Sequence, residues 1–552
     1  MTVTIDAEPA AAVVFDAIVV GAGAAGCFAA KELTEAGLSV LLLDAGRGLD
    51  LARDFPVPPP RSFGLLDRVV LAASGQSIQA RCLACTRSLR RFYVTDRENP
   101  YRSAPGKPFN WFRGRQVGGR LHTWGRVAPR FSDWELQPST RSMKGVDWPL
   151  SYDELAPFYS NVERFLGVHG VCEGLPQLPD GEFIAARPLT GLEEHVRNEV
   201  IRRWPTRRFR SAPVVRHNPL RVPLPLLAAM ETGKLTLRAN AVVKRIHLDA
   251  PGARAAGVDF IDRMTTKPVR TRARVVVLCA SAIESVRILL NSATSQHPDG
   301  VGNSSGLLGR FLMDHCMVAV GGDVPATLPP LDESRNADAV GDPYDLASLY
   351  LYMPGFRNIT EPVEAPFHGS FSILGSVGRS GRRFLLLGFG DMAPSPDNRV
   401  RIDSRHHDAW GIPIPTLECT HSANDRALIR DMIETMREIA AAAGLRVRSA
   451  VGKPTGLVRR TLHHTVLKSV LTRDNAFHPG AAIHEMGGAR MGADRRSSVV
   501  NRFNQCWDVP NVFITDGACF VSSGHQAHTL TIMALTVRAC EYIVAQDRAG
   551  AL

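Results

Sequence analysis

The sequence predicts an α/β protein that combines a parallel sheet with a second, antiparallel sheet. Near the start of the chain, an apolar run at residues 17–20, a helical pattern over 24–36 and a second apolar run at 39–43 form a strand–helix–strand unit. Units of this kind build parallel sheets. Farther along, residues 318–324, 371–377 and 384–390 alternate apolar and polar side chains between Pro/Gly loops, which indicates antiparallel strands. We therefore expect two lobes, with helices flanking both sheets.

The turn after the first strand reads Gly21-x-Gly23-x-x-Gly26. Gly21 permits a tight turn, Gly23 lets the backbone approach a pyrophosphate, and Gly26 lets helix and strand pack closely. The N–H groups and dipole at the start of the helix favour phosphate binding. Asp44 ends the second strand, where an acid can bond a ribose hydroxyl. The pattern indicates a dinucleotide site and leaves both FAD and NAD open.

Composition places the chain among globular proteins. It has 552 residues, of which 45% are hydrophobic and 22% charged, so it is long enough for two or more domains. No apolar run is long enough to cross a membrane, so we expect no membrane insertion. Residues 1–12 lack the basic and apolar regions of an export signal, and we expect a cytoplasmic protein.

The ten cysteines are scattered, which suits a reducing compartment better than a disulfide framework. Cys82-x-x-Cys85 is a close pair, but no second pair and no histidines at zinc spacing accompany it. The pattern favours two ordinary cysteines over a metal or redox site, and we expect no metal.

The net charge of +11 comes mostly from arginine and fits an anionic substrate, an acidic partner or nucleic acid. The basic residues form short pairs, such as Arg459-Arg460, and not a patch interleaved with aromatic residues. This favours a solvated arginine-rich surface, and we expect no nucleic-acid partner.

The elements between the first unit and residue 320 follow from local signals. A proline-rich stretch at 55–61 precedes a segment that we expect to be helical to about Arg91. Ser151 and Glu154 form the capping box of a helix. Residues 235–248 read as strands, and 257–261 with 270–278 as a hairpin that leads into a small-residue turn and a helix ending at Asn291.

The second half of the chain adds an amphipathic helix at 424–443 that Gly444 ends, a strand at 512–515 followed by Asp516-Gly517, and a helix over 529–545. We expect one domain built from residues 14–135, 236–320 and 475–552, and a second built from 136–235 and 321–474.

Three histidines near the C-terminus are the densest group of acid–base side chains: His484 before a glycine-rich turn, and His525 and His528 before the last helix. Histidine titrates near neutrality, so it can remove a hydroxyl proton while hydride leaves the carbon.

These motifs together resemble the glucose–methanol–choline (GMC) oxidoreductases, FAD enzymes that oxidise alcohols and sugars. The resemblance runs from residue 14 to about 545. It is carried by the Gly21–Gly26 turn with Asp44-Ala-Gly46, the Gly118-Gly119 loop, residues 280–292, residues 309–315, Asp397-Asn-Arg-Val with Asp403, and the His484 and Asp516-Gly517 segments. Within the family, 148–155 and 504–511 are similar to the pyranose 2-oxidase and glucoside 3-dehydrogenase branch.

The resemblance implies a Rossmann-like FAD-binding domain and a substrate domain built on the antiparallel sheet. It also implies a set of cofactor-binding residues: Gly21, Gly23, Ala24, Ala25, Gly26, Asp44, Ala45, Arg115, Gly118, Gly119, His122, Thr123, Trp124, Val243, Ala280, Asp516, Gly517 and Thr529. Pyranose 2-oxidase bonds its flavin through a histidine directly before the loop tryptophan. Here Thr123 precedes Trp124 and the histidine is one step earlier, at His122, so we expect non-covalent FAD.

The family also implies that His484 is the catalytic base and that hydride passes to flavin N5. The usual second residue, Asn or His, falls on Ala527, which cannot accept a proton. We expect His528, with His525 as the alternative, to take this role. Substrates would be sugars, glycosides or other secondary alcohols, with oxygen, a quinone or a cytochrome as acceptor and with an oligomer or accessory subunit allowed. The change at Ala527 also leaves open a lyase or natural-product tailoring reaction, and a non-enzymatic flavin protein or an NAD-dependent dehydrogenase are further alternatives.

Overall fold

The computed structural model describes residues 2–3, 13–56, 65–82, 84–86, 88–140, 145–250, 252–331, 349–361, 366–379, 381–448, 471–472 and 476–552. Most of the N-terminal stretch and the Arg459-Arg460 pair lie outside these residues.

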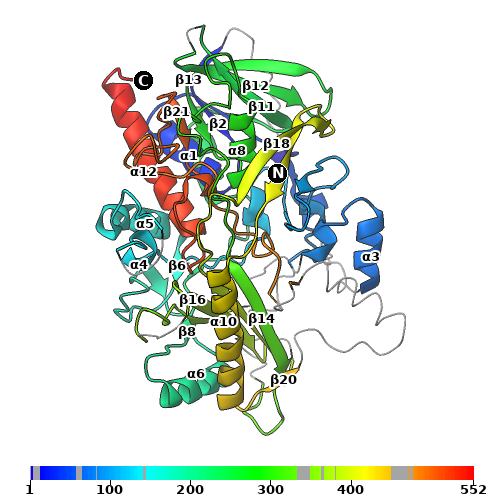
Figure 1. Ribbon diagram of the computed structural model, residues 1–552, viewed down its shortest axis with the longest axis vertical. Helices are drawn as coiled ribbons and strands as arrows, with labels where there is room; N and C mark the ends of the chain where they lie inside the picture. The colour runs from blue at the N-terminus through cyan, green and yellow to red at the C-terminus, as the bar shows by residue number, and fades with distance from the viewer. Residues whose placement is uncertain are drawn as a thin grey trace.

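A seven-stranded sheet forms the upper half of the molecule in Figure 1. Its strands are β10 (Leu235–Arg238), β3 (Val40–Leu43), β2 (Val14–Val20), β13 (Pro268–Leu278), β12 (Ala255–Asp262) and β11 (Ala241–Leu248), in that order, with β21 (Val512–Ile514) also on β13. The pairs among β10, β3, β2, β13 and β21 are parallel, whereas β11, β12 and β13 are antiparallel. The predicted strand–helix–strand unit and the predicted hairpin are both present in this sheet.

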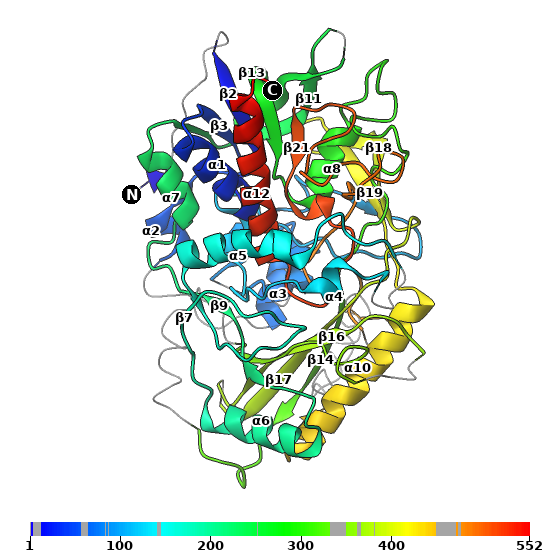
Figure 2. The same ribbon diagram turned by 90° about the vertical axis from the view of Figure 1, so that its left-hand side faces the viewer.

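Helices cover both faces of this sheet, because its central strands are apolar on both sides. On one face, Val19 belongs to the core cluster that contains Leu33 of α1 (Ala24–Glu35) and Ile543 of α12 (Thr529–Arg548). On the other face, Ile18 belongs to the cluster that contains Ile283 of α8 (Ala282–Leu290). Figure 2 shows α1 and α12 side by side in front of the sheet.

A six-stranded sheet forms the lower half, and each of its pairs is antiparallel as predicted. Its order is β20 (Arg446–Arg448), β14 (Cys316–Asp323), β17 (Arg383–Gly390), β16 (Phe371–Val377), β15 (Leu351–Met353) and β8 (Arg210–Ser211). Helices α10 (Ala423–Ala442) and α6 (Gly191–Arg203) pack on one face (Figure 2). The other face bears Phe389, whose ring lies 5.6 Å from that of His484.

Shorter elements connect the two halves. Ser151 and Glu154 form the predicted capping box of α5 (Tyr152–Leu166), which packs against α12. The remaining elements are β1 (Thr2–Val3), β4 (Leu49–Asp50), α2 (Leu51–Asp54), α3 (Leu65–Ala73), η1 (Gln79–Arg81), η2 (Arg90–Phe92), β5 (Arg102–Ser103), η3 (Gly119–His122), α4 (Asp133–Leu136), β6 (Val168–His169), β7 (Phe183–Ala185), β9 (Val214–Val215), α7 (Leu224–Glu231), β18 (Arg399–His407), β19 (Pro413–Glu418) and η4 (Gly517–Cys519).

The helix expected to reach Arg91 is much shorter, and this prediction was wrong beyond α3. Gly75 adopts φ +96°, and the N–H of Gln76 donates to the carbonyl of Leu71, which closes a C-terminal cap. The chain then continues to Arg91 through turns and short 3₁₀ segments.

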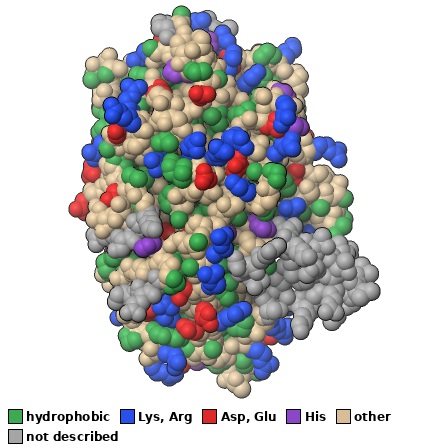
Figure 3. Space-filling view, in the orientation of Figure 1, with side chains coloured by type: hydrophobic (Ala, Val, Ile, Leu, Met, Phe, Trp, Pro, Cys, Tyr) green, Lys and Arg blue, Asp and Glu red, His purple; other side chains and the backbone are tan. Residues whose placement is uncertain are grey.

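Basic side chains are spread over the face shown in Figure 3, with acidic ones among them. Arg399 and Arg401, for example, both pair with Glu418. Within the described part of the chain, none of the helices has the length and apolarity needed to span a bilayer.

Candidate active site

Four segments that are distant in sequence meet at the carboxyl ends of the parallel strands. The first is the glycine turn before α1. A Cβ on Gly26 would lie 1.7 Å from the carbonyl oxygen of Gly21, so these two glycines let strand and helix touch. A Cβ on Gly23 would meet nothing within 4 Å, and Gly23 caps α1 without a side-chain hydrogen bond. The first turn of α1, which includes Ala24 and Ala25, therefore leaves open space beside its N–H groups.

Asp44 and Ala45 follow the second strand. The Asp44 carboxylate accepts hydrogen bonds from Ala22 N (2.9 Å) and Gly46 N (2.7 Å), so it fixes the turn as well as its own loop. Burial raises the pKa of Asp44, and these N–H groups oppose the shift. The carbonyl of Asp44 accepts from Ala241 N, two residues before Val243 on β11, so Val243 lies beside this edge.

Arg115 approaches the same edge from the second segment, which is the loop that leads to Gly118 and Gly119. Its guanidinium donates to Glu284 of α8 at 2.6 Å, and its charge opposes the rise in the pKa of Asp44. The arginines around Glu284 lower the pKa of that carboxyl to about 2, although burial opposes them. The pair ties the loop before Gly118 to the first turn of α8.

The Gly118-Gly119 loop lies directly on the glycine turn. Gly118 N donates to Ala22 O (2.8 Å), and a Cβ on Gly119 would be 3.1 Å from Gly23 Cα. Both glycines have positive φ, +92° and +51°. This approach explains why the sequence has two glycines here.

Arg120 connects this loop to two other segments and was not predicted from the sequence. It donates to Ser281 Oγ (3.3 Å) and Ile483 O (2.7 Å) and forms a 2.5 Å ion pair with the buried Glu485. The third segment, Ala280-Ser281, thus meets the fourth, which carries His484.

The Asp516-Gly517 pair completes the junction. Asp516 accepts from Ser285 Oγ of α8 (2.5 Å) and from Ala518 N (2.9 Å). A Cβ on Gly517 would lie 2.7 Å from Glu485 O, so only glycine allows this contact without a shift. The pKa of Asp516 is raised to about 6 by burial.

Three histidines form a tight cluster at this junction. The His484 ring lies 4.9 Å from that of His315 and 4.7 Å from that of His528, with both contacts edge-to-face. The Nδ1 atoms of His315 and His484 are 2.7 Å apart. His315 and His528 are buried, whereas His484 keeps partial exposure. His484 is therefore the member of the cluster that a small molecule can reach.

Burial keeps this cluster neutral. It lowers the pKa of His484 and of His528 well below the usual value, with further lowering from neighbouring imidazoles and Arg120. His528 is the N-cap of α12 and Thr529 its first residue. The positive end of the α12 dipole also disfavours a charged ring at this position, so burial and the dipole both favour neutral His528.

His525 lies apart from the three rings, beside two carboxyl groups. Its Nε2 is 3.1 Å from Glu135 Oε1, and its Nδ1 is 3.9 Å from Asp391 Oδ2. Burial raises the pKa of Glu135 to about 8 and lowers that of His525 to about 3. At neutral pH both groups are therefore uncharged, with the carboxyl group of Glu135 protonated.

Asp314 anchors the segment that carries His484. Its buried carboxylate accepts from Gly480 N (2.7 Å), Ala482 N (3.1 Å) and His484 N (3.0 Å). Ile483 between them adopts φ +64°, which is strained for a β-branched residue. Burial and the nearby Glu485 raise the pKa of Asp314 to about 7.

His122 is packed between aromatic rings. It stacks on Phe92 at 5.3 Å, and its Nε2 lies 2.9 Å from the carbonyl oxygen of Val117. Burial lowers its pKa to about 4. Thr123, whose hydroxyl donates to Arg120 O (3.4 Å), turns the chain toward Trp124, which lines a pocket together with His122.

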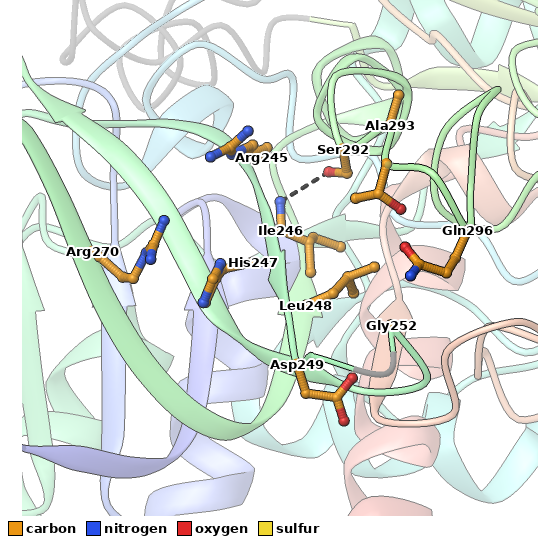
Figure 4. A pocket seen from close by; sticks show the side chains of 11 residues that line it. Arg245, Ile246, His247, Leu248, Asp249, Gly252, Arg270, Ser292, Ala293 and Gln296 are labelled. Atoms are coloured by element: carbon orange, nitrogen blue, oxygen red, sulfur yellow. Dashed lines mark hydrogen bonds between the residues drawn. The ribbon is translucent and has the colours of Figure 1, made fainter.

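A different pocket, shown in Figure 4, lies at the edge of the seven-stranded sheet, between β11 and the residues after α8. None of its lining residues belongs to the predicted site. Ser292 there accepts from Ile246 N, and Arg245 and Arg270 both bind Asp259. Its charged groups have structural partners.

The structure thus gathers the predicted glycine turn, the Gly118-Gly119 loop, the start of α8, His484, His528 and Asp516-Gly517 around one junction. Arg120, Asp314 and His315 are functional candidates that sequence reasoning missed. The motif at residues 309–315, which ends in Asp314-His315, contained the signal for two of them.

Comparison with known proteins gives a consistent result. Two family models, both described as GMC oxidoreductase, match residues 15–317 and 394–536. The chain is 27% identical over 582 residues to 2-methyl-1,2-propanediol dehydrogenase of Mycolicibacterium austroafricanum, covering 96% of this chain and 95% of that protein. It is 26% identical over 575 residues to paromamine 6'-oxidase of Streptomyces fradiae, covering 96% and 91%.

Solved structures share the fold. Formate oxidase of Aspergillus oryzae, in a structure described for its FAD modification, superposes with a TM-score of 0.66 at 15% identity, covering 98% of this chain and all of the other. A pyridoxine 4-oxidase structure superposes with a TM-score of 0.61 at 17% identity, covering 96% and 98%.

Proposed function

The chain belongs to the GMC oxidoreductase family, whose enzymes use FAD, and from this premise we propose that it oxidises a hydroxyl group of a sugar, glycoside or other secondary alcohol to a carbonyl group. The observation that carries the proposal is the partly exposed His484, set among buried imidazoles beside the glycine turn.

The residues at the junction fit FAD. The open space at Gly23, the uncapped start of α1 and the glycines of the 118–119 loop suit a pyrophosphate. Asp44, Ala45, Arg115 and Val243 form the edge that would take the adenosine part. Ala280, Asp516, Gly517 and Thr529 lie toward the histidines, where the flavin would be held. Bound FAD supplies an acceptor for the two electrons removed from the alcohol.

His484 would remove the hydroxyl proton. At neutral pH its ring is uncharged, because burial lowers its pKa, so a nitrogen lone pair is ready to accept. The O–H bond of the alcohol breaks, and the proton is held on a ring nitrogen of His484. Two hydrogen bonds hold the backbone that carries this ring. Arg120 donates to Ile483 O at 2.7 Å, and Asp314 accepts from His484 N at 3.0 Å.

His528 would be the partner that orients the substrate oxygen. The family position at Ala527 lacks a polar side chain, but the next residue places its ring 4.7 Å from that of His484. His525, the alternative, lies apart from the three rings, with its Nε2 3.1 Å from Glu135 Oε1. This arrangement argues against the lyase and tailoring alternatives, which depended on an empty second position.

A cytoplasmic location is part of the proposal. All ten cysteines are free thiols and nine are buried, which suits a reducing compartment.

The proposal is tested by recording the visible spectrum of the FAD-loaded protein without oxygen while sugars, glycosides and simple secondary alcohols are added. We expect one class to bleach the flavin band. His484→Asn should slow bleaching by roughly 10²- to 10⁴-fold, because a general base contributes about that much. The exposed His368 serves as the control, since His368→Ala should change nothing. Bleaching by no alcohol, or an unaffected His484 variant, would contradict the proposal.

A further inference from the structure

His315 lies in direct contact with His484, the proposed base. It immediately precedes β14, 1% of its surface is exposed, and its Nδ1 is 2.7 Å from Nδ1 of His484. The two rings are nearly perpendicular, at 86°. A separation of this size between two ring nitrogens requires that one donates and the other accepts.

The direction of this hydrogen bond follows from the chemistry. A neutral imidazole carries one N–H, so His484 can accept a hydroxyl proton on Nε2 only if its own proton is on Nδ1. His484 Nδ1–H then donates to Nδ1 of His315. His315 in turn carries its proton on Nε2, on the side away from His484.

Nε2 of His315 is buried and, among the described residues, has no hydrogen-bond partner, so this atom does not decide between the tautomers. The backbone of Ser523 and Gly524 interacts with the ring in the sense that raises its pKa, although burial lowers that pKa to about 4 overall. Buried Phe520 and half-buried Phe389 pack near the cluster, so solvent does not replace these contacts.

We propose that His315 is a positioning residue, which holds His484 in the Nδ1–H tautomer and shares the positive charge that His484 gains from the substrate proton. The inference rests on the proposed function. As the substrate O–H bond breaks, an N–H bond forms at His484 Nε2. The Nδ1–H bond to His315 then becomes charge-assisted, and its proton can move onto His315 Nδ1 while the total charge of the pair stays at +1.

Other charged and titratable groups face this pair from each neighbouring element. His528 lies at the start of α12, His525 in the preceding loop, Arg120 on η3 and Asp314 beside His315, while Glu485 follows His484. Arg120, His528 and a positively charged His315 each disfavour a charged His484, so His315 can help only as a neutral acceptor or by taking the proton itself. Glu485 is paired with Arg120, and Asp314 bonds backbone N–H groups. The ring nitrogen of His315 is thus placed to offset the cost of protonating His484.

The test compares His315→Phe, which removes the acceptor at similar size, with His315→Asn, whose side-chain oxygen can still accept from Nδ1–H. Anaerobic flavin reduction by a bleaching alcohol is measured between about pH 5 and pH 9. His315→Phe should lower the rate constant roughly 10- to 100-fold, as expected for a lost hydrogen bond to a charged group. In the plot of this rate constant against pH, the limb that reports deprotonation of His484 should move to lower pH, because the His484 imidazolium is less stable without the acceptor on His315. His315→Asn should keep both the rate constant and the pH of this limb near their wild-type values.

His195→Phe is the matched control, because His195 also bonds at one nitrogen, 3.2 Å from Ala443 O, but lies on α6 away from the site. It should leave rate and pH profile unchanged. A His315→Phe enzyme with wild-type rate and pH profile would overturn the inference.

A second readout needs no variant. Spectra of the FAD-loaded wild type with ¹⁵N-labelled histidine distinguish a protonated ring nitrogen from an unprotonated one. We expect the proton of His484 on Nδ1 and that of His315 on Nε2, and the opposite tautomer at His484 would overturn the inference. If no alcohol bleaches the wild type, the proposed function fails, and this spectrum still decides the tautomer.

Discussion

Asp314 offers the sharpest test of how the site is held together, because one side chain fixes the segment that ends at His484. Its Oδ2 accepts from Gly480 N and Ala482 N, and its Oδ1 accepts from His484 N. Asp314→Asn keeps the shape but replaces one acceptor oxygen by an NH₂ donor. If the remaining oxygen still accepts from Gly480 N and Ala482 N, the N–H of His484 faces the new NH₂ group and loses its hydrogen bond.

The expected cost follows from that lost bond. A buried N–H without an acceptor costs about 1–3 kcal/mol, and a middle value of about 2 kcal/mol corresponds to a roughly 30-fold larger local opening constant. The strained Ile483, at φ +64°, is free to relax once the anchor is lost. We therefore expect His484 to be misplaced and flavin reduction to slow by roughly tenfold or more.

Hydrogen exchange of the backbone amides measures this directly. The His484 amide should exchange roughly 30-fold faster in Asp314→Asn, while most amides of β2 and β13 stay as in wild type. Asp180→Asn is the control, because Asp180 also accepts two backbone N–H groups, from Glu173 and Gly174, away from this segment. An unchanged His484 amide together with an unchanged reduction rate would refute the reasoning.

Three further predictions concern the cofactor and the buried charges. Gly118→Ala should abolish FAD retention on gel filtration, since Gly118 has φ +92° and its new Cβ would lie 2.1 Å from His122 Nε2; a yellow variant would count against the loop's role. Acid precipitation should release the flavin into the supernatant, because His122 is stacked on Phe92, and flavin retained in the pellet would show a covalent link. Glu135→Gln should flatten the loss of stability between pH 6.5 and 8. In the folded protein the pKa of Glu135 is raised to about 8, so in this window Glu135 binds more protons than it does in the unfolded chain. Its deprotonation as the pH rises therefore lowers the free energy of unfolding by about 2 kcal/mol, which is measured as a falling Tm. If the variant keeps the wild-type slope of Tm against pH, Glu135 is not the source of the loss.

Much of the fold could be predicted from the sequence because its signals are local. The glycine turn, the apolar strands around it and the capping box at Ser151 and Glu154 each depend on residues a few positions apart. The antiparallel sheet was predicted for the same reason, since alternation marks each strand singly. The helix expected up to Arg91 failed because Gly75 takes a left-handed conformation that ends α3 early.

The site was only partly predictable, since its contacts join distant segments. His484 and His528 stood out by their motifs, but the 2.7 Å contact between His315 and His484 spans 169 positions. Glu135 meets His525 across a still longer separation, and no periodicity relates them. Asp314 looks like an ordinary acid before a strand until the fold brings the loop at Gly480 to its carboxylate.

The place of β21 and α12 in the seven-stranded sheet has a consequence for synthesis of the chain. β21 pairs with β13, which lies next to β2, and α12 covers α1, so segments that are translated early and segments that are translated much later are neighbours. While residues 512–548 are still untranslated, α1 is without its covering helix and the sheet lacks a strand. The emerging polypeptide therefore needs protection of this apolar face until residues 512–548 have been translated. A premature stop codon anywhere before residue 512 would leave that face uncovered in the released product.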